Sequence, residues 1–207
     1  MKPPPYRIET DLLVLRCWEP ADAPRLKEAL DASVEHLKPW MPWAHDEPSP
    51  VEAIAARLRT FRGRFDLDEE YVYGAFDPDG RTVVGGAGLH PRSGPGSLEI
   101  GYWIRPERLR RGLATGASAA LTQVAFRVCG VERVEIHVDP ENVASLGVPE
   151  KLGFRREATL RRRLESAPAS APRRDVVVFA LFDDEYAGSP AAAVELRGFD
   201  AAGVRAI

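Results

Sequence analysis

Apolar residues alternate with polar ones, or form short runs, in seven parts of the chain, and this spacing predicts β-strands. The expected strands are residues 11–17, 71–76, 81–90, 99–104, 132–138, 154–164 and 175–182. Elsewhere apolar residues recur at the spacing of one helix face. The expected helices begin at residue 22, cover 51–65, run from 113 to 128 and cover 142–152. An antiparallel meander thus meets a strand–helix–strand crossover, which predicts an α+β fold with a mixed, mostly antiparallel sheet of about seven strands and about four helices.

The ends of the chain differ in pattern from its middle. Residues 1–10 are a proline-rich lead, and residues 165–172 form a loop of Ser, Ala and Pro. Residues 183–192 have the composition of a linker, and residues 194–207 predict a terminal hairpin. We therefore expect one domain over residues 1–185 and a C-terminal extension over residues 186–207.

Composition excludes several classes of protein. The chain has 207 residues and a net charge of −3, which gives no general reason to expect nucleic-acid or membrane binding. Cys17 and Cys129 lie in apolar contexts, without the spacing of a metal site or a disulfide framework. No apolar run is long enough to cross a membrane, and the start lacks the apolar core of a signal peptide. We expect a cytoplasmic protein without a metal.

Residues 99–121 predict a strand, a basic turn and a helix, and this stretch is the first candidate site. Gly112, Ala114 and Thr115 have little or no side chain to hold a ligand away from the backbone. A helix start also leaves about four N–H groups free and carries partial positive charge. The stretch therefore predicts a phosphate or pyrophosphate site, although an ordinary turn glycine at Gly112 is the alternative. It contains neither a Walker loop nor a G-x-G-x-x-G fingerprint.

The basic turn R-R-G-L-A-T resembles the acetyl-CoA loop of the GNAT acyltransferases, whose pattern is Gln/Arg-x-x-Gly-x-Gly/Ala. Residues 110–114 fit its last five positions. Leu109 stands where the family has Arg or Gln, and Gly116 stands where many relatives have an acidic residue. Arg108 or Arg110 is expected to supply the charge. The resemblance implies acetyl-CoA as co-substrate and a sheet whose two central strands splay apart around the pantetheine arm.

A second stretch, residues 138–154, is similar to the RimJ/RimL type within that family, as are L-V-L-R, H-L-K-P-W-M-P-W and R-D-V-V-V-F-A-L elsewhere in the chain. The type includes ribosomal-protein alanine N-acetyltransferases, and the similarity covers roughly residues 9–185. Asn142 is well placed to cap a short helix. The resemblance also implies that Asn142 contacts the pantetheine arm, and Ser145, Gly153 and Phe154 match the same pattern.

The reaction that the resemblance implies is direct attack of an amine on the thioester, without a covalent enzyme intermediate. Ser145 matches the general acid proposed for RimL-like enzymes, whereas the tyrosine acid of other relatives is excluded by Pro149. Glu99, on the central strand, is the favoured general base. The alternatives are a water-relayed base and the side chains of Glu135, Glu157, Glu165 and His137.

The expected cofactor contacts follow from the same resemblance. A backbone N–H near Trp103 or Ile104, freed by a bulge, would stabilise the oxyanion. One or two of Arg105, Arg108, Arg110 and Arg111 would meet the phosphates. The full set of cofactor-binding candidates is Trp103, Ile104, Leu109, Arg110, Arg111, Gly112, Leu113, Ala114, Thr115, Asn142 and Ser145.

The acceptor is open among a protein N-terminal amine, a lysine and a small amine. Trp40, Met41 and Trp43 either cover the core or line the acceptor pocket. The loops over residues 31–50 and 165–174 contain no deciding motif. A non-catalytic acyl-CoA-binding regulatory module is the alternative function, because Leu109, Gly116 and Pro149 depart from common patterns. Nucleic-acid binding by the arginines of residues 155–163 is disfavoured, since no aromatic residues interleave them. Monomer and homodimer both remain open.

Overall fold

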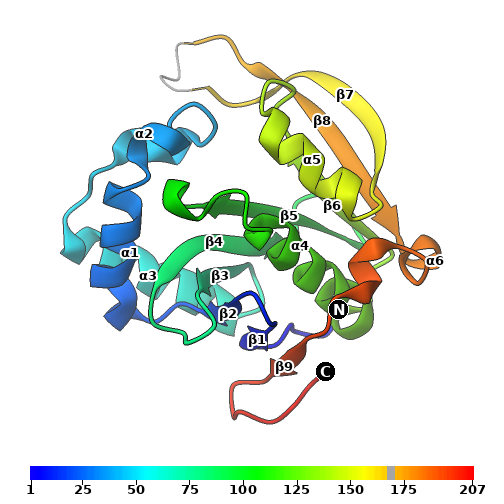
Figure 1. The fold of residues 1–207 in the computed structure, drawn as a ribbon, viewed down its shortest axis with the longest axis horizontal. Helices are drawn as coiled ribbons and strands as arrows, with labels where there is room; N and C mark the ends of the chain where they lie inside the picture. The colour runs from blue at the N-terminus through cyan, green and yellow to red at the C-terminus, as the bar shows by residue number, and fades with distance from the viewer. Residues whose placement is uncertain (167–170) are drawn as a thin grey trace.

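A computed structural model describes residues 1–166 and 171–207 of the chain. Nine strands form one sheet in the order β7-β8-β6-β5-β4-β3-β2-β1-β9 (Figure 1). The strands are β1 Arg7–Glu9, β2 Val14–Cys17, β3 Tyr71–Phe76, β4 Val83–His90, β5 Ser97–Ile104, β6 Arg133–Val138, β7 Arg155–Leu164, β8 Arg174–Phe182 and β9 Arg197–Phe199. The helices are α1 Ala23–Asp31, α2 Val34–Leu37, α3 Val51–Asp66, α4 Leu113–Val124, α5 Val143–Lys151 and α6 Asp183–Tyr186.

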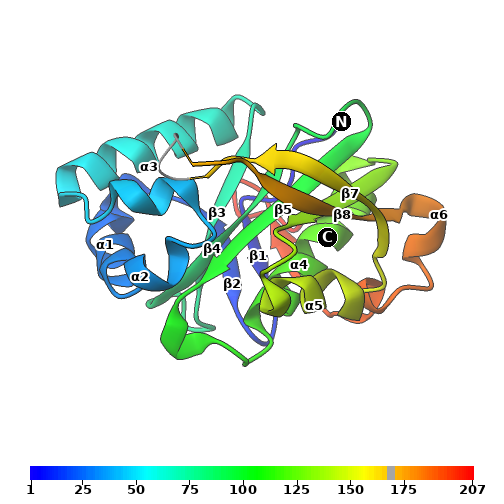
Figure 2. The same ribbon diagram turned by 90° about the horizontal axis from the view of Figure 1, so that it is seen from above.

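The helices cover the two faces of the sheet. Seen from above, α1 and α3 lie on one side of the strands, and α4 and α5 lie on the other (Figure 2). On the first side, buried residues of α1 and α3 pack with Val14, Phe76 and Val83. On the second side, the alanine-rich face of α4 packs on alternate residues of β5, including Leu98 and Ile100. Because side chains alternate across a strand, the remaining residues of β5 face α1 and α3.

The two central strands separate after three residue pairs, as the resemblance implied. β5 and β6 are parallel and pair only at residues 97–99 with residues 133–135. Beyond Glu99, β5 continues to Ile104 in unbroken antiparallel register with β4. β6 continues to Val138 in register with β8. The sheet is therefore open on the β6 side of β5 beyond Glu99, and this opening is where α4 and α5 begin.

The α+β class and the mixed, mostly antiparallel sheet are confirmed, but the sheet has nine strands rather than about seven. The proline-rich lead contains β1, a strand of three residues that is too short to show a period. The expected linker over residues 183–192 instead contains α6 and a short 3-10 turn, Pro190–Ala193. Residues 31–50 contain α2 and a second 3-10 turn, Pro42–Asp46, that begins at a proline. Part of the expected 165–172 loop, residues 167–170, lies outside the described residues.

The C-terminal residues run back along the molecule to the far edge of the sheet. The Gln123 amide of α4 donates hydrogen bonds to the carbonyl oxygens of Ala191 and Val194. β9 then pairs antiparallel with β1, and Phe199 forms a single bridge with Arg205. The expected terminal hairpin forms around Asp200: the Gly198 N–H donates to the Ile207 carbonyl oxygen at 3.1 Å, and the Asp200 N–H donates to the Val204 carbonyl oxygen at 2.9 Å. Its first arm, β9, also extends the sheet.

Candidate active site

The turn between β5 and α4 exposes a row of backbone donors. Arg110 and Gly112 both have left-handed backbone conformations, with φ of 60° and 78°. The first helical bond of α4 runs from the Gly116 N–H to the Gly112 carbonyl oxygen, at 2.8 Å. No described residue accepts a hydrogen bond from the N–H groups of residues 110–115. Six consecutive donors at the positive end of a helix are suited to a phosphate or pyrophosphate group.

The arginines of this turn fall into two sets. Arg105 is held by Glu107 at 3.1 Å, by Glu28 at 3.4 Å and by the Val83 carbonyl oxygen at 3.3 Å. Among the described residues, no carboxylate pairs with the other three arginines, which are Arg108, Arg110 and Arg111. These three guanidinium groups are therefore the ones available to an anion.

Leu12 explains one departure from the family pattern. A Cβ built on Gly116 would lie 3.3 Å from Leu12 Cδ1, which also approaches Gly112. The Leu12 side chain therefore lies over the first turn of α4, where an acidic side chain at position 116 would meet an apolar neighbour. The loop before β2 covers the helix start here, and the free N–H groups remain. We find no comparable contact that accounts for Leu109, whose side chain is exposed.

A hydrogen bond crosses the opening between β5 and α5. The Tyr102 and Ser145 hydroxyl oxygens are 2.8 Å apart, and the Tyr102 hydroxyl also lies 3.2 Å from the Ser145 carbonyl oxygen. Asn142 caps α5 by accepting the Ser145 N–H at 3.1 Å, as its position predicted. Burial raises the pKa of Tyr102 to about 12, which the bond to Ser145 only partly opposes. Sequence reasoning missed Tyr102, although it alternates with Ile100 and Ile104 on the face that α4 covers.

Glu99 lies on the opposite face of β5 from Tyr102, beside a cluster of charged groups. Its carboxylate accepts two hydrogen bonds from Arg92, at 2.8 and 2.5 Å, and lies 3.5 Å from His137 Nδ1. Burial alone would raise the pKa of Glu99, but the hydrogen bonds from Arg92 outweigh it and hold that pKa below its ordinary value. Glu99 is thus a buried carboxylate that stays ionised.

His137 joins Glu99 to the neighbouring strand. Its other ring nitrogen, Nε2, lies 2.6 Å from Glu135, which also accepts a hydrogen bond from Arg133 at 2.7 Å. Glu99 and Glu135 are direct partners in the short β5–β6 ladder. The two carboxylates would repel each other, so the arginines and the histidine between them stabilise the pair. Glu157, another candidate base, is exposed on the outer strand β7, and Glu165 follows that strand.

Aromatic residues meet on the same side of β5 as Glu99. The Trp43 and Trp103 rings lie edge to face, with centroids 6.3 Å apart. Trp103 packs beside the cluster formed with α1 and α3, so these tryptophans do cover core residues. Both side chains are nevertheless partly exposed, which leaves them in reach of a ligand. The expected bulge near Trp103 or Ile104 is absent, because β5 keeps its register with β4; the loss of β6 as a neighbour opens that backbone instead.

Arg174 links three segments around this side of the opening. Its guanidinium donates to the Pro39 carbonyl oxygen at 2.8 Å, to Asp139 at 2.5 Å and to the Glu165 carbonyl oxygen at 3.2 Å. The end of the β7–β8 hairpin is thereby tied to the 31–50 segment and to the start of α5. Figure 2 shows this hairpin arching toward α2 and α3.

The described residues contain no group of three or more His, Cys, Asp and Glu side chains placed to hold a metal ion. Within the same residues, every helix is too short or too polar to cross a bilayer.

Comparisons with known proteins agree on one family. A family model described as an acetyltransferase (GNAT) domain matches residues 13–155. The ribosomal protein uS5-alanine N-acetyltransferase of Escherichia coli (strain K12) is 28% identical over 156 residues, which are 74% of this chain and 80% of that protein. Mycobacterium smegmatis RimJ in complex with CoA-disulfide has 27% identity and a TM-score of 0.78, and 90% of each chain is covered. RimL in complex with coenzyme A shares the fold, with a TM-score of 0.73, 19% identity and coverage of 84% of this chain and 95% of that one. The similarity to the RimJ/RimL type is confirmed.

Proposed function

Because this chain belongs to the GNAT acetyltransferase family, we propose that it transfers an acetyl group from acetyl-CoA to a primary amine of a protein or a small molecule. The observation that carries the proposal is the opening between β5 and β6. It has free backbone donors at one end and the Tyr102–Ser145 hydrogen bond across it. The uS5-alanine N-acetyltransferase among the relatives favours a protein N-terminal amine as the acceptor.

The turn before α4 is suited to the pyrophosphate of acetyl-CoA. The N–H groups of residues 110–115 have no described protein acceptor, and three nearby arginines have no described carboxylate partner. Gly112 adopts a left-handed conformation in which only Leu12 comes within 4 Å of an added Cβ, so the backbone is approachable. In the proposed complex these groups neutralise the phosphates, while Asn142 and the β5 backbone flank the pantetheine arm.

Ser145 is proposed as the general acid. Acetyl-CoA supplies an activated thioester, and the departing thiolate needs a proton. The Ser145 hydroxyl already has a hydrogen-bond partner in Tyr102, whose raised pKa keeps the phenol protonated at neutral pH. The two hydroxyl groups therefore hold protons at the point where β5 and α5 meet. No residue needs to form an acyl intermediate: both cysteines are buried, and burial raises the pKa of each thiol to about 12.

Glu99 is proposed to take the proton from the acceptor ammonium, either directly or through a water. Its ionised carboxylate lies on the face of β5 that also presents Trp103, opposite the face with Tyr102. An amine approaching from the Trp103 side and a thioester from the α4 side would then meet in the opening of the sheet. The lowered pKa of Glu99 keeps its carboxylate ionised, so it can attract and orient the ammonium before it accepts the proton.

Two measurements on the wild-type protein test this function. Isothermal titration with acetyl-CoA should give micromolar affinity or better. A thiol-detection assay with a panel of N-terminal peptides, lysine peptides and small amines should release free CoA only when an amine is present. Binding without release of CoA for any amine would favour the alternative, a non-catalytic acyl-CoA-binding regulatory module. Absence of binding would reject both functions.

A further inference from the structure

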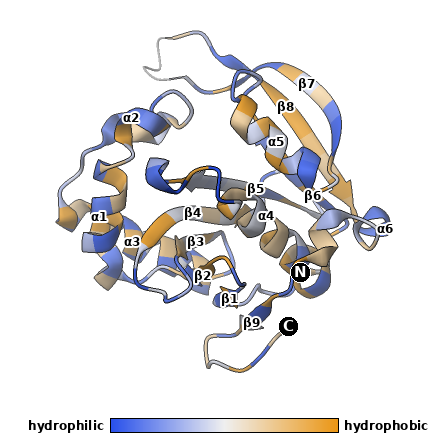
Figure 3. Cartoon of the chain, viewed as in Figure 1, coloured by the Kyte–Doolittle hydropathy of each residue, from blue (hydrophilic) through white to orange (hydrophobic). Residues whose placement is uncertain are grey.

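The edge strand β7 lies outside the proposed site and is unusually exposed. It is the last strand in the sheet order, so its outer edge has no neighbouring strand among the residues that the structure describes. Eight of its ten residues are exposed, although a strand on a sheet normally buries one face. Figure 3 shows apolar positions along β8 and hydrophilic positions toward both ends of β7. β7 therefore offers free backbone groups and two open faces.

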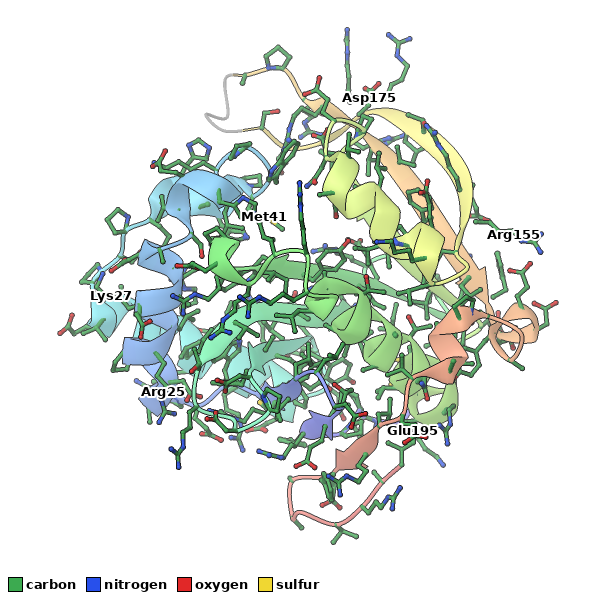
Figure 4. The ribbon with its side chains drawn as sticks, in the orientation of Figure 1. Arg25, Lys27, Met41, Arg155, Asp175 and Glu195 are labelled. Atoms are coloured by element: carbon green, nitrogen blue, oxygen red, sulfur yellow. The ribbon has the colours of Figure 1, made fainter. Side chains whose placement is uncertain are left out.

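Most of the charge on β7 is positive and unpaired. Arg155, which projects from the outer side of the strand in Figure 4, pairs with Glu185 at 2.7 Å. Among the described residues, no carboxylate pairs with four further arginines near the turn of the β7–β8 hairpin. These are Arg161, Arg162, Arg163 and Arg173. A protein with a net charge of −3 thus concentrates unpaired positive charge on one edge.

A bulge displays three of these arginines together. The pairing of β7 with β8 jumps from Leu160 to Leu164, so residues 161–163 leave the ladder. Arg162 has a φ of 56°, and its N–H donates to Asp175 Oδ1 at 2.9 Å. A left-handed conformation is uncommon for a long side chain, and here the hydrogen bond to Asp175 holds it. All three arginines of the bulge are exposed.

This basic bulge lies beside the acceptor side of the proposed site. Arg174, directly before Asp175 on β8, contacts Pro39 of the 31–50 segment and Asp139 before α5. Asp175 lies at the same end of the hairpin (Figure 4). A polymer bound along β7 would therefore end next to the opening of the sheet.

We propose that β7 docks an acidic, extended segment of the acceptor protein, which adds to the sheet edge while its amine reaches the opening. This inference rests on the proposed function. An extended peptide matches the free N–H and C=O groups of the edge, and carboxylates match the arginines. A second copy of this chain fits poorly, since strand-to-strand pairing of β7 would oppose arginines with arginines. A nucleic acid cannot pair with the strand edge as a peptide strand does, and no aromatic residues lie between the arginines.

The test compares two acceptor peptides with the same first four residues. One continues with eight residues rich in Glu, and the other replaces each Glu by Gln. For the wild type, we expect the KM of the Glu peptide to be at least fivefold lower, and the advantage to disappear in 0.5 M salt. In Arg161→Gln/Arg163→Gln the two KM values should agree within twofold. Arg59→Gln/Arg81→Gln, which removes the same charge from exposed sites elsewhere, should behave like the wild type.

A second measurement separates this proposal from the proposed function. Fluorescence anisotropy with an N-terminally blocked Glu peptide reports binding without turnover, and the β7 variant should weaken it at least fivefold. If small amines are acetylated but peptide charge affects neither KM nor anisotropy, the docking surface is rejected and the acetyltransferase stands. If nothing is acetylated but the blocked peptide binds through β7, the surface stands and its role in acceptor choice is rejected. Tighter binding of a single-stranded RNA of matched length, or a dimer that buries β7, would overturn the proposal.

Discussion

Tyr102 on β5 and Ser145 on α5 share a hydrogen bond of 2.8 Å, and this bond is a direct contact between the two sides of the open sheet. Tyr102 is partly buried, and its pKa of about 12 keeps the phenol protonated at every pH at which the protein is expected to work. Any proton that leaves the Ser145 hydroxyl can be replaced through this contact. In the proposed mechanism, this pair supplies the proton for the departing thiolate.

Ser145→Ala should slow the reaction and leave cofactor binding almost unchanged. If Ser145 is the general acid, kcat should fall by about 10²-fold or more. The helix cap uses the Ser145 N–H and the Asn142 side chain, and alanine keeps that bond. We therefore expect the free energy of unfolding to change by no more than about 1 kcal/mol. Steady-state kinetics and urea unfolding check both parts.

Tyr102→Phe is the matched control for that variant. It removes the partner of the Ser145 hydroxyl without removing the hydroxyl itself, so kcat should fall less than in Ser145→Ala. Equal kcat values for Ser145→Ala and the wild type would exclude Ser145 as the acid.

Gly112→Asp should abolish acetyl-CoA binding. The change puts a carboxylate where the pyrophosphate is proposed to lie, and it forces a β-carbon onto a residue with a φ of 78°. We expect Kd for acetyl-CoA, measured by isothermal titration, to rise at least tenfold. Gly112→Ala separates strain from charge, because it adds the β-carbon without the carboxylate. Gly94→Asp, at another left-handed glycine with open space around it, controls for the added charge. Unchanged affinity in Gly112→Asp would place the phosphates elsewhere.

Arg92→Gln should shift the pH dependence of catalysis if Glu99 is the base. Hydrogen bonds from Arg92 hold the pKa of Glu99 below its ordinary value against the effect of burial. Without Arg92, burial is less opposed, so the pKa of Glu99 rises and a larger fraction is protonated at mildly acidic pH. The acidic limb of the kcat/KM profile should therefore move to higher pH. A profile that does not move, in a variant that still folds and binds acetyl-CoA, would remove Glu99 from the proton pathway.

Glu70→Gln should flatten the acid dependence of stability. A hydrogen bond with His90 lowers the pKa of Glu70 from 4.5 to about 2, with partial opposition from burial. A depressed carboxylate pKa stabilises the folded protein above pH 4.5, and that contribution is lost as the pH falls toward 2. Linkage sets an upper limit of about 1.4 kcal/mol per pH unit for this loss, and solvent screening of the partly exposed Glu70 should keep the measured loss well below that limit. Urea unfolding of Glu70→Gln and of exposed Glu69→Gln, which should match the wild type, measures the difference.

Gly85→Ala should destabilise the sheet beside the opening. An added Cβ would lie 2.1 Å from the Trp103 carbonyl oxygen and 3.1 Å from Ile104 Cα, and these backbone atoms cannot move without separating β4 from β5. We expect a loss of at least about 2 kcal/mol in the free energy of unfolding. Gly63→Ala is the control: it lies inside α3 with nothing within 4 Å, and should gain about 0.5–1 kcal/mol. Similar thermal melts for both variants would contradict the close approach of these strands.

The sequence was most informative where one local pattern had one structural solution. Tyr71–Phe76 formed a strand over the expected residues, and Asn142 capped α5, because alternation and capping chemistry act over a few neighbouring residues. β1 and β9 were not predicted as strands of the sheet. Each has three residues, and each is a strand because of its neighbour in the sheet rather than its own composition.

The candidate site was predictable in its backbone and less so in its side chains. The turn at Gly112 follows from glycine and small residues in sequence. The contact of Tyr102 with Ser145 and the contact of Leu12 with the Gly116 position each join residues that are distant in the chain. Such pairs depend on how β5, α5 and the loop before β2 are placed, which no local period encodes. The expected β5 bulge failed for the same reason: strand separation opens that edge instead.

Three paired residues are the whole ladder between β5 and β6, so backbone hydrogen bonds join the two plates of the sheet over a short length only. One plate carries β9 through β5 with α1 and α3, and the other carries β6, β8 and β7. A molecule seated in the opening would act as a second joint and fix the angle between the plates. The hydrogen bond from Arg174 to the Pro39 carbonyl oxygen already joins the two parts on the acceptor side, so such a molecule would add to a link that the protein makes itself.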